Sequence, residues 1–78
     1  MDRQEMLVEI EGLLELDAGS LAESVPLADI PNWDSMQALN FILLVQQTAG
    51  KVIEGVEVNR ARTVGDLLDS VFGAQSRG

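Results

Sequence analysis

The chain has 78 residues, a net charge of −8 and a hydrophobic share of 46%, and it contains neither cysteine nor histidine. These values predict one small folded domain with a thin core rather than a disordered chain. The composition excludes disulfides, thiolate and imidazole metal ligands, and the usual general base at neutral pH. The negative charge argues against a nucleic-acid partner, because it would repel a phosphate backbone.

The charge is uneven, since residues 1–34 hold nine acidic residues and one basic residue, whereas residues 35–78 hold four of each. The longest strongly apolar run, Phe41 to Val45, is much shorter than the roughly 20 apolar residues that a membrane span requires. The amino end, residues 1–5, is charged and lacks the apolar stretch of a signal peptide. We therefore expect a soluble, cytoplasmic monomer without membrane contact, and Met1 together with the short tail favours a freestanding protein.

The first predicted helix covers about residues 2–16, with acidic residues in its first turn, where the helix dipole favours them. Its apolar residues recur at helical spacing: Met6, Ile10, Leu13 and Leu14. A long connection with two helix-breaking prolines follows from Asp17 to Trp33, and connections of this length are often functional. Four apolar side chains are expected to fasten it to the helices: Leu21, Val25, Leu27 and Ile30.

The second predicted helix runs from Asp34 to about Ala49. Asp34 is a good N-cap, Gln37 follows at capping-box spacing, and Gly50 is a natural stop. A wide apolar stripe makes this the helix that we expect to be most buried. The stripe consists of Met36, Leu39, Ile42 and Leu43, widened by Phe41, Leu44 and Val45.

Residues 51–62 are weakly patterned, and we predict a loop with a short, irregular helical turn near 56–61, because a lone strand would have no partner. The last helix begins after the cap Thr63 and ends at Gly73. The predicted fold is therefore all-α: a four-helix bundle over residues 1–73, with a long first connection and a short third helix. Residues 74–78 are expected to form a disordered tail.

The segment from Pro31 to Met36 carries the functional signal, because it places Ser35 in the first turn of a helix directly after a loop. There the hydroxyl points outward, within reach of a modifying enzyme. The unpaired N–H groups and the dipole of a helix start suit a phosphate ester. The alternative is an ordinary serine at a helix start, beside Asp34 as the cap.

On these residues the chain resembles the acyl carrier protein family, including peptidyl carrier domains, over about residues 3–73. That family has Asp-Ser-Leu at the start of its second helix, and this chain has Asp34-Ser35-Met36. The family's preceding loop commonly ends in Gly-Trp or Gly-Ala, where this chain has Asn32-Trp33. The segment Thr63-Val64-Gly65-Asp66-Leu67-Leu68 also resembles the start of the family's fourth helix.

The resemblance implies a bundle of the acyl-carrier type in which Ser35 carries 4′-phosphopantetheine. The thiol of this arm would hold an acyl or aminoacyl group as a thioester, which suits a chain without cysteine. The implied partners are a phosphopantetheinyl transferase and the acyl- or aminoacyl-loading and acyl-processing enzymes.

Trp33, Met36, Gln37 and Asn40 are the predicted contact residues for these partners. For Met36 we favour a place in the core, and for Trp33 a role in packing the loop is an equal alternative. Carriers of fatty acid synthesis have several acidic residues on the second helix, where this chain has amides, which steer partners less. We therefore expect dedicated enzymes of a polyketide, nonribosomal peptide or other specialised acyl pathway, with a general fatty acid carrier as the alternative.

An acyl-chain cavity is a further hypothesis, lined by residues that are first of all core candidates: Leu39, Ile42, Val56, Val58 and Leu68. An enzyme is not expected, because Ser35 has no histidine to activate it and so thin a core predicts no pocket of useful size. Glu11 and Glu15 are expected one turn apart on an exposed helix face, and no selective metal site is expected there. The main competing function is a helical interaction module that has the carrier fold but is never modified.

Overall fold

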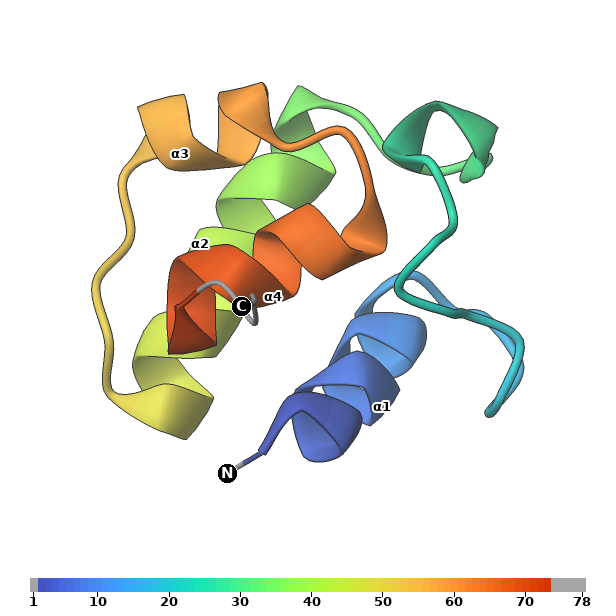
Figure 1. Ribbon diagram of the computed structural model, residues 1–78, viewed down its shortest axis with the longest axis horizontal. Coiled ribbons are helices and arrows are strands. Elements are labelled where there is room, and N and C mark those ends of the chain that lie inside the picture. Colours follow the sequence, from blue (N-terminus) through green and yellow to red (C-terminus); the bar gives the residue numbers. More distant parts are fainter. Residues whose placement is uncertain (1, 74–78) are drawn as a thin grey trace.

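The computed structural model describes residues 2–73 of the chain, and within them it contains helices and no strand (Figure 1). The elements in chain order are α1 (Arg3–Leu13), the 3-10 helix η1 (Leu27–Asp29), α2 (Ser35–Ala49), α3 (Gly55–Arg60) and α4 (Val64–Phe72). The all-α class is thus confirmed as a small helical bundle. The predicted disordered tail, residues 74–78, lies outside the described residues.

The four α-helices enclose one core. In Figure 1, α4 lies across the centre between α1 and α3, with α2 behind it, and both α2 and α4 contact α1 and α3. The buried core is aliphatic apart from Phe41 and receives side chains from all four α-helices and from the connections between them. Its fully buried members are Met6, Ile10, Leu14, Phe41, Val45, Val64, Leu67 and Leu68.

Helix α1 begins as predicted but ends three residues early. Asp2 and Glu5 form a reciprocal capping box at its start. At its end, Glu15 adopts a positive φ of 60°, its N–H donates to the carbonyl of Gly12, and the N–H of Leu16 donates to the carbonyl of Glu11. This pair of bonds is a Schellman motif, which turns the chain out of the helix before residue 16.

The connection from α1 to α2 is fastened at two places. Oε2 of Glu11 accepts hydrogen bonds from the N–H groups of Gly19 and Leu21, at 3.0 and 2.9 Å. Glu11 is only 3% exposed, so the expectation that it shares an exposed face with Glu15 is wrong. The carboxylate is buried because the loop folds over it and supplies the donors.

The second fastening joins the loop to the start of α4. The N–H of Leu27 donates to the carbonyl of Arg62 at 2.8 Å, and the N–H of Gly65 donates to the carbonyl of Glu23 at 2.8 Å. Of the four apolar residues predicted to hold the loop, three are buried, Leu21, Leu27 and Ile30, and Val25 is half-buried. The loop therefore holds the start of α2 in a fixed position.

Helix α2 has the predicted bounds, with Asp34 as N-cap and Gly50 in the left-handed conformation after its end. The prediction that it is the most buried helix is wrong. Only Phe41 and Val45 of its 15 residues are buried, whereas α4 buries Val64, Leu67, Leu68 and Val71 within nine residues. The apolar stripe is wider than the surface that α1 and α3 cover, so part of it faces outward.

The carboxyl half otherwise follows the sequence pattern. The short helix predicted near 56–61 is α3, Gly55–Arg60, and Thr63 caps α4 through a capping box with Asp66. Ile53 is buried and the neighbouring Val52 is exposed, without any strand. No helix in residues 2–73 is long and apolar enough to cross a bilayer.

Candidate functional site

The start of α2 is built by Asp34. Its backbone is extended, and its Oδ1 accepts the N–H of Gln37 at 2.9 Å, while its carbonyl accepts the N–H of Ala38 at 2.9 Å. The cap is as predicted, but the capping box is not completed. The side chain of Gln37 instead accepts a hydrogen bond from Nδ2 of Asn40 at 3.1 Å.

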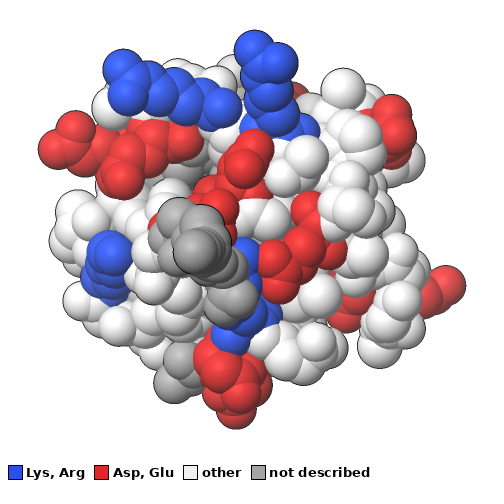
Figure 2. All heavy atoms as spheres, viewed as in Figure 1, with Lys and Arg blue, Asp and Glu red and all other residues white. Residues whose placement is uncertain are grey.

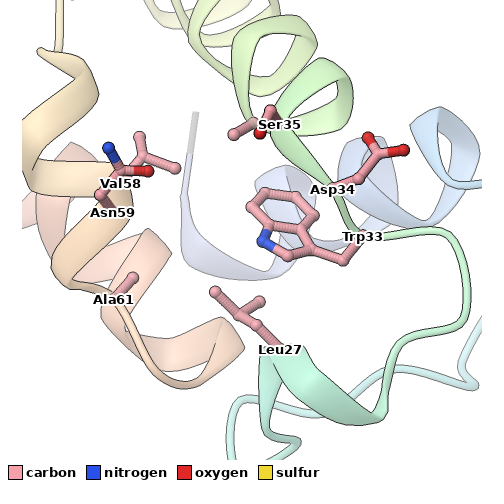
Figure 3. A pocket seen from close by; sticks show the side chains of 8 residues that line it. Leu27, Trp33, Asp34, Ser35, Val58, Asn59 and Ala61 are labelled. Atoms are coloured by element: carbon pink, nitrogen blue, oxygen red, sulfur yellow. The ribbon is translucent and has the colours of Figure 1, made fainter.

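Ser35 is the first residue of α2, and its side chain is exposed. Its N–H and that of Met36 have no hydrogen-bond partner among the described residues. Two free donors at the positive end of a helix dipole, next to an accessible hydroxyl, form an environment that favours an esterified phosphate. The carboxylate of Asp34 points away from the space beside Ser35 (Figure 3).

Two adjoining hollows lie between α2 and α3, and Ser35 lines both of them. They share four lining residues: Ser35, Ala38, Val58 and Asn59. The first, shown in Figure 3, has a volume of about 320 Å³ and is completed by Leu27, Trp33, Asp34 and Ala61. The second, of about 240 Å³, is completed by Leu39, Ile42 and Gly55. The short helix α3 leaves this gap beside the longer α2, and both hollows are open to solvent.

The residues predicted to flank Ser35 have different environments. Trp33 is half-buried, packs against the core and lines the first hollow, so it holds the loop and also faces the site. Met36 is 66% exposed, so its assignment to the core is wrong: it lies on the outward side of α2, which no other element covers. Gln37 and Asn40 are half-buried and bonded to each other.

Of the five residues proposed to line an acyl cavity, three line the hollows and two do not. Leu39, Ile42 and Val58 line the hollows. Val56 is exposed on α3 and Leu68 is fully buried within the core, and neither lines a hollow. Leu39 is 53% exposed, so it forms the rim of its hollow and is no core residue.

The site is almost free of charge. Asp34 is the one charged residue that lines either hollow, and α2 contains no charged residue in its sequence. Charged side chains lie elsewhere, and on the face shown in Figure 2 acidic and basic groups are interspersed. Helix α2 itself therefore contributes little to the long-range attraction of a basic partner.

Comparisons with protein-family models, with curated proteins and with solved structures find no match to this chain. Its function is therefore inferred from its own residues and their geometry.

The hydroxyl of Ser35 receives no activating contact within residues 2–73, since no side chain there is hydrogen-bonded to it. A hydroxyl in this state is suited to modification by a separate enzyme that supplies its own base. Asn59 lies across the first hollow from Ser35 and Trp33 (Figure 3). No sequence pattern indicated Asn59, because residues 51–62 lack a periodicity that would fix which side of α3 faces α2.

Proposed function

We propose that this chain is a carrier protein that holds a 4′-phosphopantetheine arm on Ser35 and carries an acyl or aminoacyl group as a thioester on the thiol of the arm. The observation that supports it most is the exposure of Ser35 as the first residue of α2, where it lines both hollows between α2 and α3. The resemblance of residues 3–73 to the acyl carrier protein family is the second support.

The modification needs little from the carrier. In the transferase, the oxygen of Ser35 attacks the β-phosphorus of coenzyme A, a phosphodiester forms, 3′,5′-ADP leaves, and the serine proton passes to a base of the transferase. The carrier supplies an accessible hydroxyl on a rigid helix start. The free N–H groups of Ser35 and Met36 offset part of the repulsion between the new phosphate charge and Asp34.

The outward side of α2 is the surface that partners would meet. Met36, Leu39 and Leu43 are all exposed and follow one another along it, beginning next to Ser35. An enzyme that reaches Ser35 covers Met36 first, and Gln37, Asn40 and Trp33 border this contact. Because the stripe is apolar and uncharged, it fits a dedicated partner with an apolar recess better than a general partner with a basic surface.

Intact mass after incubation with coenzyme A and a broadly acting phosphopantetheinyl transferase tests the proposal. We expect the gain of one arm, abolished in Ser35→Ala and retained in Ser24→Ala, a matched change of an exposed serine elsewhere. Circular dichroism shows that both variants are folded. A transferase that loads a reference carrier in the same tube but leaves this chain unmodified rules out the carrier function.

The unmodified interaction module is the second candidate, and the exposed apolar stripe of α2 supports it equally. The mass experiment separates the two functions. A further assay with general fatty acid synthase enzymes tests the specialised pathway: efficient use of the loaded chain at physiological salt would instead identify a general fatty acid carrier.

A further inference from the structure

A methionine is the most exposed member of the apolar stripe on the outward side of α2. The stripe consists of Met36, Leu39 and Leu43, whose exposed fractions are 66%, 53% and 46%. Met36 directly follows Ser35 in the first turn of the helix, and helical side chains lean toward the amino end of their helix. The thioether of Met36 therefore lies at the end of the stripe that borders Ser35.

Met6 is the opposite case within the same chain. It lies on α1 and is 0% exposed in the core. A peroxide in solution reaches Met36 in the folded chain, but it reaches Met6 only when the core opens. Oxidation converts the flexible, apolar thioether of methionine into a polar sulfoxide, and sulfoxide reductases reverse this change. Among residues 2–73, Met36 is thus the methionine whose polarity can change while the fold stays intact.

We propose that Met36 is a reversible oxidation site, and that its oxidation by a peroxide hinders partner enzymes at Ser35. The sulfur of Met36 attacks one oxygen of hydrogen peroxide, and the S–O bond forms as the O–O bond breaks. The proton of the transferred oxygen passes to the departing hydroxide, which leaves as water. The sulfur is oxidised and the peroxide is reduced by the same electron pair. This inference rests on the proposed function, because the contact that oxidation weakens is that of a partner at Ser35.

The lack of charge on α2 makes its contacts sensitive to this change. The helix contains no charged residue, so its contact with a partner depends on the apolar side chains. A sulfoxide oxygen that enters an apolar recess gives up its hydrogen bonds to water, which weakens the contact. The same sulfoxide costs the free chain little, because Met36 is largely exposed. Oxidation therefore acts on the contact and spares the fold.

Peptide mass spectrometry after brief treatment with hydrogen peroxide tests whether Met36 is the site. Cleavage on the amino side of aspartate separates Met6 from Met36, because Asp17, Asp29 and Asp34 lie between them. We expect Met36 to gain one oxygen at least about tenfold faster than Met6, since oxidation of Met6 requires the core to open. The urea midpoint should stay unchanged at this stage. Equal rates at the two methionines would overturn the inference.

Loading of Ser35 by the transferase tests the consequence of oxidation. We expect kcat/KM to fall about fivefold in oxidised wild type and to recover after treatment with methionine sulfoxide reductases for both epimers. Met36→Leu keeps an apolar side chain without sulfur, so it should load like wild type before and after peroxide, although Met1 can still be oxidised. Met36→Gln should load like the oxidised chain without any peroxide.

The outcomes separate this inference from the proposed function. Oxidation of Met36 that leaves kcat/KM unchanged overturns the inference and leaves the carrier function standing. A loss of kcat/KM that also occurs in Met36→Leu assigns the effect to another residue and overturns the inference as well. If neither the reduced nor the oxidised chain is loaded although a reference carrier is, the carrier function is overturned, and the role of Met36 at Ser35 is overturned with it.

Discussion

Glu15 occupies the one position among residues 2–73 where a residue other than glycine has a positive φ. It fills the place in the Schellman motif at the end of α1 that glycine usually takes, because a Cβ is crowded in this conformation. The left-handed conformation costs a non-glycine residue about 1–2 kcal/mol. A glycine avoids this cost, but it loses more backbone entropy on folding, which offsets part of the gain.

We therefore expect Glu15→Gly to raise the free energy of unfolding by about 0.5–1 kcal/mol, measured by urea titration. The matched variant Glu9→Gly changes an exposed glutamate inside α1 and should lower it by about 1 kcal/mol. Equal losses in the two variants would show that residue 15 does not have this backbone conformation in solution.

Gly65 and Gly12 are both helical glycines but have different surroundings. A Cβ on Gly65 would lie 3.1 Å from the carbonyl oxygen of Glu23, the atom that also accepts the N–H of Gly65. A Cβ on Gly12 would meet nothing within 4 Å. The first glycine permits the close approach of the loop, and the second only weakens its helix.

From this difference we predict that substitution by alanine lowers the stability of the fold at Gly65 and raises it at Gly12. Gly65→Ala should destabilise the fold by about 1–3 kcal/mol through crowding against backbone. Gly12→Ala should stabilise it by about 1 kcal/mol through helix propensity. Thermal unfolding of the two variants side by side tests this, and a stabilising Gly65→Ala would contradict the fastening of residues 23–27 to the start of α4.

The outward face of helix α2 carries no charged residue along its whole length. No charge on α2 contributes to steering, so we expect the apolar side chains of this face to carry the contact with the transferase. The variants Leu39→Gln and Leu43→Gln should lower kcat/KM without lowering stability, because both side chains are about half exposed. Val8→Gln, an equally exposed apolar residue of α1, is the control and should load normally.

Unchanged loading of both leucine variants would place the contact elsewhere on the chain.

The elements differ in how far the sequence could predict them. Helix α4 was predictable because its cap Thr63, its apolar period and its stop Gly73 act within one segment. The bounds of α2 followed in the same way from Asp34 and Gly50. Local signals could not show which part of its stripe remains uncovered, since that depends on the width of α1 and α3 after packing. Met36 was misplaced for this reason.

The site shows the same division. The exposure of Ser35 and the cap at Asp34 follow from local signals, whereas the hollow and the facing Asn59 depend on where α3 packs. Glu11 was misplaced because its burial depends on a loop eight to ten residues further along the chain. Contacts between distant segments, such as that of Leu27 with Arg62, leave no periodic pattern in either segment.

Arg3 joins three parts of the molecule. Its Nη2 lies 2.5 Å from Oε1 of Glu23 in the loop and 3.1 Å from Oδ1 of Asp69 in α4. The hydrogen bond from Arg3 holds the pKa of Glu23 below its ordinary value of 4.5. Backbone N–H groups of Arg62 and Thr63 likewise hold the pKa of Asp66 below its ordinary value of 3.8.

A carboxylate whose pKa is lowered by folding stabilises the fold above its ordinary pKa, and this contribution disappears as the pH falls through the lowered value. We therefore expect the urea midpoint to be steady near neutral pH and to decline below about pH 4.5. Asp66→Asn should be less stable than wild type at pH 7. Its urea midpoint should also decline less steeply in acid, since residue 66 then has no carboxylate to protonate. If the urea midpoint of this variant falls in acid as steeply as that of wild type, other carboxylates are responsible for the decline.

The fastening of residues 23–27 to residues 62–65 also has a temporal consequence. During synthesis on a ribosome, the loop that presents Ser35 is made first, yet the backbone groups that hold it are made about forty residues later. A nascent chain that stops before Arg62 carries the serine but lacks its support. The loop that precedes Ser35 is therefore held in place only after residues 62–65 have been made.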